Sequence, residues 1–291
     1  MYVHLVDGTY ELFRYFFALP SHVTSKGREV AATRGVLGTC LQLIEDGATH
    51  VGVATDHIIE SFRNDLLASY KTGAGVDPAL KQQFPLIEEV LQAAGFTVWP
   101  MVEVEADDAL AAAAEVAAAD DRVERALICT PDKDLGQCVT EDGRIVQLDR
   151  RKGIVYDHDG VVAKFGVLPS SIPDYLGLVG DTADGIPGIA GWGAKGSAAV
   201  LSRYPHYEDI PPAPGQWDVP VRGAAKLARA LFDDYDNALL YRRLATVERD
   251  VPVGKVDEWR WDGPTDELAA LCRSIDAPNL AARAERLAGV R

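Results

Sequence analysis

The sequence is poor in several features, and each shortage excludes a class of protein. Its four cysteines lie far apart without a Cys-x-x-Cys pair, which disfavours a disulfide framework or a zinc site and predicts free thiols in a reducing compartment. The longest weakly polar stretch, residues 109–119, contains Glu115 and is shorter than the roughly 20 residues that cross a bilayer. The N-terminus lacks a basic segment before an apolar run, so we expect no secretory signal, a cytoplasmic location and no membrane partner.

Positive charge is also scarce. The 291 residues include 29 Lys and Arg against 44 Asp and Glu, for a formal net charge of −15. Such a chain does not hold nucleic acid by bulk positive charge. It can still concentrate carboxylates in one place to hold metal ions, so the positions of the acids matter more than their number.

The first half of the chain alternates short apolar runs with longer amphipathic segments. We expect strands at residues 3–6, 50–55, 97–101, 126–130 and 145–148, and helices at 34–45, 80–94 and 107–119, with a further helix after Asp7. This alternation predicts an α/β fold with a mostly parallel sheet flanked by helices. After about Phe165 the chain changes to short helical patterns separated by Pro and Gly, so we expect domains at 1–168 and 169–291.

Carboxylates recur where the expected strands end. Asp7 and Asp56 follow the first two strands, and further acids follow the third and fourth, at Glu105, Asp107, Asp108, Asp132 and Asp134. Because the carboxyl ends of parallel strands face a common crevice, separate segments would deliver these acids to one edge. Asp181 and Asp184, three residues apart, form another acidic pair.

Nine carboxylates gathered together repel one another, and hard divalent cations relieve that repulsion, with Mg²⁺ or Mn²⁺ the best fit. Each acid taken alone is explained as well by a helix cap, a turn or a solvated face. Their repetition after strands favours the metal hypothesis for the set.

Six motifs occur in the order found in bacterial 5′ nucleases, and the chain resembles that family. They are Val6-Asp7-Gly8, Ser61-Phe62-Arg63, Tyr70-Lys71, Glu105-Ala106-Asp107-Asp108, Thr130-Pro131-Asp132-Lys133-Asp134-Leu135 and Gly180-Asp181-x-x-Asp184-Gly185-Ile186-Pro187-Gly188. The resemblance is to the 5′ nuclease domain of bacterial DNA polymerase I, or to a free-standing flap endonuclease. It implies a PIN-like nuclease domain with an arch or clamp at about 57–95, followed by a helical domain with a helix–three-turn–helix DNA-binding motif.

The resemblance also implies roles for the acids. All nine would serve as metal ligands: Asp7, Asp56, Glu105, Asp107, Asp108, Asp132, Asp134, Asp181 and Asp184. Asp7, Asp56, Glu105 and Asp107 would surround the catalytic ion, and Asp132, Asp134, Asp181 and Asp184 the second. Arg14, Arg63, Lys71 and Lys133 are cations suited to the scissile phosphate.

A glycine-rich turn after Asp184 is the expected duplex contact. It contains G-x-G-x-x-G, but no strand precedes it, so a dinucleotide site is disfavoured. Backbone N–H groups there would hold phosphate, and the resemblance implies K⁺ bound by the carbonyls of the turn. The expected DNA-binding residues are Gly188, Gly191, Gly193, Lys195, Gly196 and Ser197. The alternative is a turn that connects two helices and binds no phosphate.

The resemblance implies a monomeric, metal-dependent 5′-3′ exonuclease and flap endonuclease that acts on DNA flaps, nicks and 5′ ends, beside a polymerase and a ligase. A DNA-binding scaffold without turnover and a PIN-type ribonuclease are the alternatives. One departure bears on the clamp: where the family usually has an arginine three residues after Tyr-Lys, this chain continues Thr72-Gly73-Ala74-Gly75.

Overall fold

The computed structural model describes residues 1–290, which form two compact units. The first unit comprises Met1–Ile59, Gly73–Thr130 and the chain from Arg249 onward, and the second comprises Glu60–Thr72 and Pro131–Glu248. The units therefore differ from the expected division at residue 168, because the C-terminal segment returns to the N-terminal unit. The expected clamp segment, 57–95, is likewise shared between the two units.

Four parallel strands form the centre of the first unit. They are β1 (Tyr2–Asp7), β2 (His50–Asp56), β3 (Thr97–Met101) and β4 (Arg125–Cys129), in the spatial order β3-β2-β1-β4. Each agrees with the strand expected from sequence to within one residue at either end. The order runs outward from β1 to β3 and then reverses to β4, which creates a topological switch point between β1 and β4.

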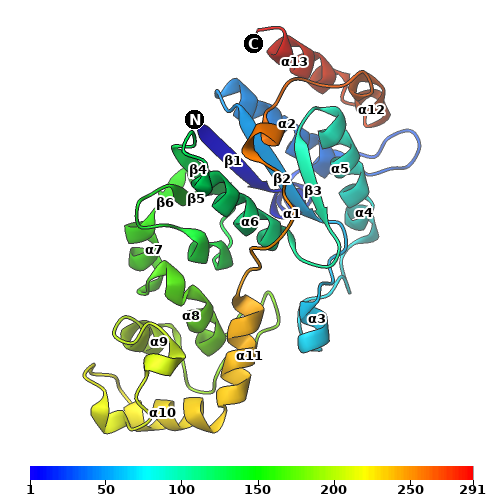
Figure 1. Ribbon diagram of the computed structural model, residues 1–291. Coiled ribbons are helices and arrows are strands. Elements are labelled where there is room, and N and C mark those ends of the chain that lie inside the picture. The colour runs from blue at the N-terminus through cyan, green and yellow to red at the C-terminus, as the bar shows by residue number, and fades with distance from the viewer. Residues whose placement is uncertain (291) are drawn as a thin grey trace. The chain divides into compact units, whose positions relative to one another are not determined.

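Helices cover both faces of this sheet, as right-handed crossovers require (Figure 1). The connections from β1 to β3 carry α1 (Gly8–Ala18), α2 (Ala31–Glu45), α4 (Pro78–Lys81) and α5 (Gln83–Ala93). The return from β3 to β4 carries α6 (Ala106–Ala119), which packs along β1, β2 and β4. The α/β prediction is confirmed.

Two helix predictions differ from the structure, and in the first case the helix expected at residues 34–45 begins earlier, at Ala31. The pattern over residues 80–94 indicated a single helix, whereas the structure has α4 and then α5, with Gln82 between them. Pro85 supplies the reason, because it has no N–H to donate to the carbonyl of Lys81. Pro85 is tolerated in the first turn of α5, where N–H groups have no partner within the helix.

The C-terminal segment packs onto β3 through tryptophans. The rings of Trp99 and Trp259 meet edge to face with centroids 5.4 Å apart, and both indole N–H groups donate to the carbonyl of Val253. The Trp261 indole donates to the Ala94 carbonyl at 2.8 Å. The segment continues through η5 (Val256–Trp259) to α12 (Leu268–Ser274) and α13 (Pro278–Ala288).

The second unit is mainly helical. Its strands β5 (Ile145–Asp149) and β6 (Ile154–Tyr156) pair antiparallel, and its short helix α3 (Arg63–Leu66) comes from the separate early segment. The longer helices are α7 (His158–Phe165), α8 (Ile172–Val179), α9 (Ala194–Leu201), α10 (Ala224–Asp233) and α11 (Tyr235–Ala245). Short 3₁₀ turns are η1 (Asp134–Cys138), η2 (Pro169–Ser171), η3 (Tyr207–Asp209) and η4 (Pro214–Gln216). Leu176, Leu201, Tyr207 and Leu231 are among its core residues.

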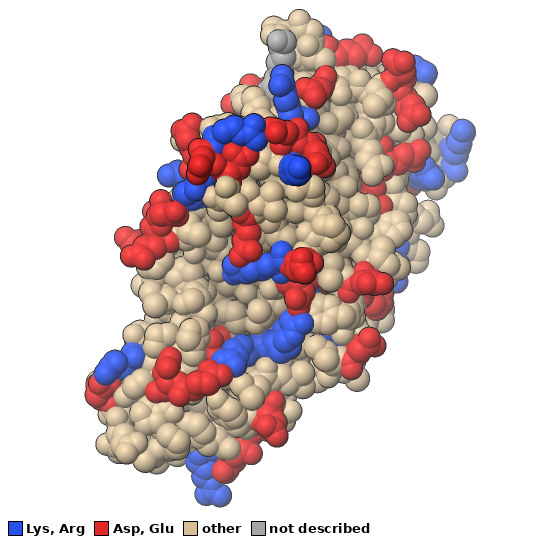
Figure 2. Space-filling model, in the orientation of Figure 1, with Lys and Arg blue, Asp and Glu red and all other residues tan. Residues whose placement is uncertain are grey.

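Three further features concern membrane-spanning helices, the cysteines and the surface charge. No helix within residues 1–290 has the length and apolarity needed to cross a membrane. All four cysteines are buried and free, as predicted. On the face shown in Figure 2, acidic and basic side chains are interspersed, so that face carries no continuous basic surface.

Candidate metal centre

Acids of the first unit lie at the carboxyl edge of its sheet, beside the switch point. Asp7 ends β1 and caps α1, with its Oδ1 accepting the Tyr10 N–H at 2.8 Å and its Oδ2 accepting the Thr130 hydroxyl, also at 2.8 Å. Thr130 directly follows β4, so the two strands that flank the switch point are joined through this carboxylate. Asp7 is only 5% exposed.

A second group surrounds the start of α6. Asp56, at the end of β2, accepts the Ala106 N–H at 2.7 Å, and Glu105 precedes the helix as its N-cap. Asp108 is fully buried and accepts the Glu105 N–H at 2.8 Å in a capping box, so it has a structural role whatever else it does. Asp107 is half-buried in the same turn. The positive end of the helix dipole favours negative charge at this position.

Gly8 explains why the turn after Asp7 has no side chain. A Cβ at this position would lie 2.8 Å from the carbonyl oxygen of Ala54 and 2.8 Å from the Thr55 methyl group. Only glycine lets the start of α1 approach β2 this closely. The close approach places the Asp7 cap beside Asp56, whose N–H donates to the Thr9 hydroxyl at 2.8 Å.

The second unit contains a tighter acidic cluster. Oxygen atoms of Asp134, Asp181 and Asp184 all lie within 4.8 Å of one another, an arrangement that could hold a metal ion. Asp132 stands next to them, with its Oδ1 accepting the Asp134 N–H at 3.1 Å. Four of the nine predicted ligands are therefore close together in this unit, although they come from two separate segments of the chain.

Asp134 is the most constrained member of this cluster. Burial raises the pKa of its carboxyl well above the usual value, and repulsion from Asp132, Asp184 and Asp181 raises the pKa further, against an opposing effect of Lys71. Its buried Oδ1 has no hydrogen-bond partner among the described residues. A buried carboxylate oxygen without a partner is costly, and it is the natural position for a cation ligand.

Two lysines, Lys133 and Lys71, supply positive charge near these acids. Lys133 forms an ion pair with Asp181, and the Lys71 Nζ lies 3.4 Å from Asp184 Oδ1. Burial by itself lowers the pKa of Lys133, but the bond to Asp181 and the other nearby carboxylates raise the pKa overall. Both lysines belong to the predicted phosphate-binding set, and the structure brings both to the cluster.

The turn that carries Asp181 and Asp184 is held by its backbone. Asp181 and Ile186 exchange N–H···O bonds of 2.9 and 2.8 Å, which closes the turn. Gly185 within it has a φ of +74°, and a Cβ there would lie 2.0 Å from the Ser69 carbonyl. The glycine therefore permits both the left-handed backbone and the close approach of the Ser69–Tyr70 segment, which leads to Lys71.

Arg63 does not fit the role expected of it. Its side chain is buried, at 2% exposure, and donates from Nε to the Leu244 carbonyl and from Nη2 to the Thr246 carbonyl, each at 2.9 Å. These carbonyls lie at the C-terminal end of α11, so the guanidinium caps that helix. We therefore correct its assignment from phosphate contact to structural cap.

Arg14 lies in the first unit, where it pairs with the buried Glu11 and stacks over the Tyr15 ring at 3.9 Å. Its Nε is buried without a hydrogen-bond partner in the described chain. The contacts of Arg14 leave a phosphate role untested.

The glycine-rich turn lies where it was expected, between α8 and α9. Gly188 and Gly191 have φ of +75° and +88°, Gly193 is the N-cap of α9, and Lys195 and Gly196 lie in the first turn of that helix. Lys195 is exposed. Ser197 is fully buried and its hydroxyl has no partner in residues 1–290, so its side chain does not face the surface as a DNA contact would.

Two supporting residues were missed at the sequence level. Thr130 stands within a quoted motif, but nothing in the pattern indicated that its hydroxyl binds Asp7. Gln147 donates to the Asp132 carbonyl from β5. A glutamine in an otherwise apolar strand that proves to be fully buried is the signal that could have identified it.

The residues present fit hard divalent cations. The donor set consists of carboxylate oxygens, and one of those oxygens is buried without a partner. The chain thus combines an α/β unit that has acids at its switch point with a helical unit that has an acidic cluster and a glycine-rich turn, and these features are those of a metal-dependent nuclease.

Comparison with known proteins identifies the family. Residues 2–166 match the model of the N-terminal resolvase-like domain of 5′-3′ exonucleases, and residues 167–267 match their C-terminal SAM fold. The chain belongs to the 5′-3′ exonuclease family, which confirms the resemblance seen in the sequence.

Two named relatives match most of this chain. The chain is 36% identical over 210 residues to a 5′-3′ exonuclease of Aquifex aeolicus, covering 72% of this chain and 71% of the relative. It is 34% identical over 287 residues to DNA polymerase I of Pseudomonas aeruginosa, covering 94% of this chain but only 30% of the polymerase. The chain thus spans about a third of the length of the polymerases that it matches.

Solved structures share the fold. A bacteriophage T5 5′-exonuclease with zinc bound matches with a TM-score of 0.65 at 18% identity, covering 99% of this chain and 98% of that chain. The catalytic core of Rad2 in complex with DNA substrate matches with a TM-score of 0.61 at 16% identity, covering 98% and 91%. These two likenesses bear on the fold alone.

Proposed function

We propose that this chain is a structure-specific 5′ nuclease that hydrolyses DNA phosphodiesters at 5′ flaps, nicks and 5′ ends, using two Mg²⁺ or Mn²⁺ ions. The observation that carries the proposal is the cluster of Asp134, Asp181 and Asp184, with one buried oxygen lacking a partner. A protein that only binds DNA gains nothing from such mutual repulsion.

The acids divide between the two ions by unit. Asp7, Asp56, Glu105 and Asp107 would hold the catalytic ion, with Asp108 supporting them through the capping box. The second ion would be held by Asp132, Asp134, Asp181 and Asp184. Such ions, when bound, supply Lewis-acid activation of water and stabilisation of the leaving oxygen.

The two lysines of the second unit, besides neutralising the acids, have a proposed role in binding phosphate. Lys133 and Lys71 serve as counter-cations to Asp181 and Asp184. With Asp181 and Asp184 bound to a dication, the ammonium groups of Lys133 and Lys71 would be able to contact a phosphate oxygen as it gains charge. The contact of these two lysines with phosphate would therefore depend on bound metal.

Duplex DNA would be held by the glycine-rich turn. Backbone N–H groups at the start of α9 and the exposed Lys195 can contact phosphate without a large basic surface. We extend the proposal to K⁺ bound by carbonyls of this turn, to a monomeric enzyme with a helix–three-turn–helix domain, and to action beside a polymerase and a ligase.

A cleavage assay tests the proposal. A labelled 5′-flap duplex and an RNA strand of matched sequence are incubated with the protein and Mn²⁺, with and without EDTA. We expect cutting of the DNA near the flap junction that EDTA abolishes. Preferential cutting of the RNA would indicate a ribonuclease instead, and binding without cutting would indicate a scaffold.

A further inference from the structure

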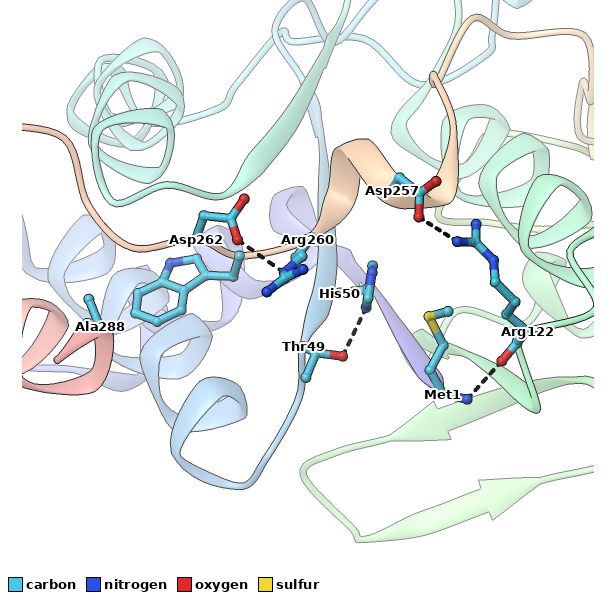
Figure 3. A pocket seen from close by; sticks show the side chains of 9 residues that line it. Met1, Thr49, His50, Arg122, Asp257, Arg260, Asp262 and Ala288 are labelled. Atoms are coloured by element: carbon cyan, nitrogen blue, oxygen red, sulfur yellow. Dashed lines mark hydrogen bonds and ion pairs between the residues drawn. The ribbon is translucent and has the colours of Figure 1, made fainter. Parts of the chain in front are cut away.

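The first unit has a cavity at the edge of its sheet opposite to the acids. This cavity has a volume of about 620 Å³. It lies where the strands begin, beside the residues that precede or start β1, β2 and β4, and residues of the C-terminal segment line its other side. Its lining includes Met1, His50, Arg122, Asp257, Arg260 and Asp262 (Figure 3).

Two donors converge in this cavity because of backbone pairing. His50 and Arg260 face each other across an antiparallel β-bridge, and the Trp261 N–H donates to the Thr49 carbonyl at 2.9 Å. Side chains directly opposite each other in such a bridge share a face of the sheet. Figure 3 accordingly shows Arg260 and His50 side by side in the cavity.

Arg260 and His50 both have hydrogen-bond donors that a ligand could use. The Arg260 Nε lies 3.0 Å from Asp262 Oδ1, which leaves the two terminal amino groups without a partner among residues 1–290. His50 is buried, at 8% exposure, and its Nδ1 lies 2.8 Å from the Thr49 hydroxyl, so Nε2 is the ring nitrogen left for a ligand. If Thr49 donates to Nδ1, a neutral His50 carries its proton on Nε2 and donates from there.

The surrounding charges define what can bind. Arg122, on the other wall, is held by Asp120 and Asp257, with Nη1 2.9 Å from Asp257 Oδ1. Burial lowers the pKa of His50, Arg260 lowers that pKa further, and Asp257 opposes the change. The cavity around His50 thus contains two arginines and two aspartates. Its two arginines are balanced by Asp257 and Asp262, which disfavours a dianion or a polyanionic backbone.

We infer that this cavity is a second ligand site, separate from the metal centre, that binds an organic carboxylate through the guanidinium of Arg260 and Nε2 of His50. A planar carboxylate matches the two terminal amino groups of an arginine. The volume exceeds that of a bare carboxylate, so the ligand carries further atoms. A small organic acid and a carboxylate on a peptide share this chemistry.

NMR titration of the full chain tests the inference. The Cε1–H signal of His50 is followed during addition of butyrate, the dipeptide acetyl-Ala-Ala or inorganic phosphate, at constant ionic strength with chloride as reference, so that both carboxylate probes carry a single charge. We expect a saturable shift with the carboxylates and a weaker response to phosphate. The tighter binding of butyrate or of the dipeptide then indicates whether the source is a small acid or a peptide.

Variants separate binding from general charge effects. Arg260→Gln should weaken carboxylate binding at least tenfold, Arg260→Lys should weaken it severalfold because the paired amino groups are lost, and Asp262→Asn should tighten it. Arg273→Gln, at an exposed position of α12 outside the cavity, is the matched control and should leave binding unchanged. A His50 signal that responds no more to carboxylate than to chloride, an Arg260→Lys protein that binds like the wild type, or tighter binding of phosphate overturns the inference.

Discussion

The two units hold their carboxylates in opposite ways. In the first unit, Asp7, Asp56 and the Glu105–Asp108 pair accept hydrogen bonds from backbone N–H groups at helix starts. In the second unit, Asp134, Asp181 and Asp184 face one another, with Lys71 and Lys133 as counter-cations. The first group is stabilised by the fold itself, whereas the second is incomplete without a cation. Both groups belong to the proposed centre, but the second, which has a buried oxygen without a partner among the described residues, should gain more stability from bound metal.

The largest expected effect comes from removing a ligand in the second unit. Asp181→Asn, or Asp132→Asn, should lower the rate of flap cleavage by about a thousandfold, because metal-assisted charge stabilisation contributes several kcal/mol. Duplex affinity should remain nearly unchanged, since the glycine-rich turn is untouched. Single-turnover cleavage and fluorescence anisotropy measure the two quantities. Unchanged turnover would mean that the second group is not part of the centre.

Gly8→Ala tests the close packing that positions the first group. The added methyl would lie 2.8 Å from the Ala54 carbonyl, so we expect a loss of about 1–3 kcal/mol in the free energy of unfolding. Gly38→Ala is the matched control, because that helical position has no atom within 4 Å of a new Cβ, and it should be neutral or stabilising. Denaturant titration of both variants measures the difference, and equal stability would contradict the packing argument.

Arg63→Ala should act on stability rather than on chemistry. The substitution leaves the Leu244 and Thr246 carbonyls without their donor, at a cost of about 1–3 kcal/mol. Well below its lowered melting temperature, the variant should cleave within a few-fold of the wild type. A normal melting temperature together with a large loss of rate would restore Arg63 to the phosphate site.

The raised pKa of Asp134 predicts that the stability of the protein depends on pH. Because the folded-state pKa is raised, the native state binds more protons than the unfolded state at pH values between the two pKa values. The stability of the metal-free protein should therefore fall as the pH rises from about 4 through the raised pKa. Asp134→Asn should flatten this fall, and added Mn²⁺ should reverse it for the wild type only. Melting curves across pH with and without EDTA provide the measurement.

The smallest effect is expected at the glycine-rich turn. Lys195→Ala removes one phosphate contact, so duplex affinity should fall by roughly tenfold or less and the salt slope by about one unit. Arg229→Gln on α10, an exposed position that forms an ion pair with Asp233, is the control. An unchanged salt slope for Lys195→Ala would remove this lysine from the DNA contact.

The sequence predicted the sheet well because its signals are local. Apolar runs bounded by acids and glycines located the four strands of the first unit, and the same acids indicated the metal centre. Helix boundaries depended on single backbone groups. The missing N–H of Pro85, in the first turn of α5, is the example, because it separates α4 from α5. The arginine of the Ser61-Phe62-Arg63 motif looked the same in sequence whether it caps a helix or contacts phosphate, because its partners lie about 180 residues away.

Long-range packing was beyond sequence reasoning for the same reason. The return of the C-terminal segment to the first unit depends on the Trp259 and Trp261 contacts with residues 93–99, and no local period reveals that pairing. The division at residue 168 followed a change in composition, which reports secondary structure but not which segments share a core.

The central claim is that Asp134, Asp181 and Asp184 form a cation site. Anomalous diffraction from a crystal soaked in Mn²⁺ tests it most directly. The account predicts an anomalous peak within about 2.0–2.4 Å of a carboxylate oxygen of Asp134, with Lys133 moved away from Asp181. A well-ordered cluster that keeps the Lys133–Asp181 ion pair and shows no peak at saturating Mn²⁺ would contradict it.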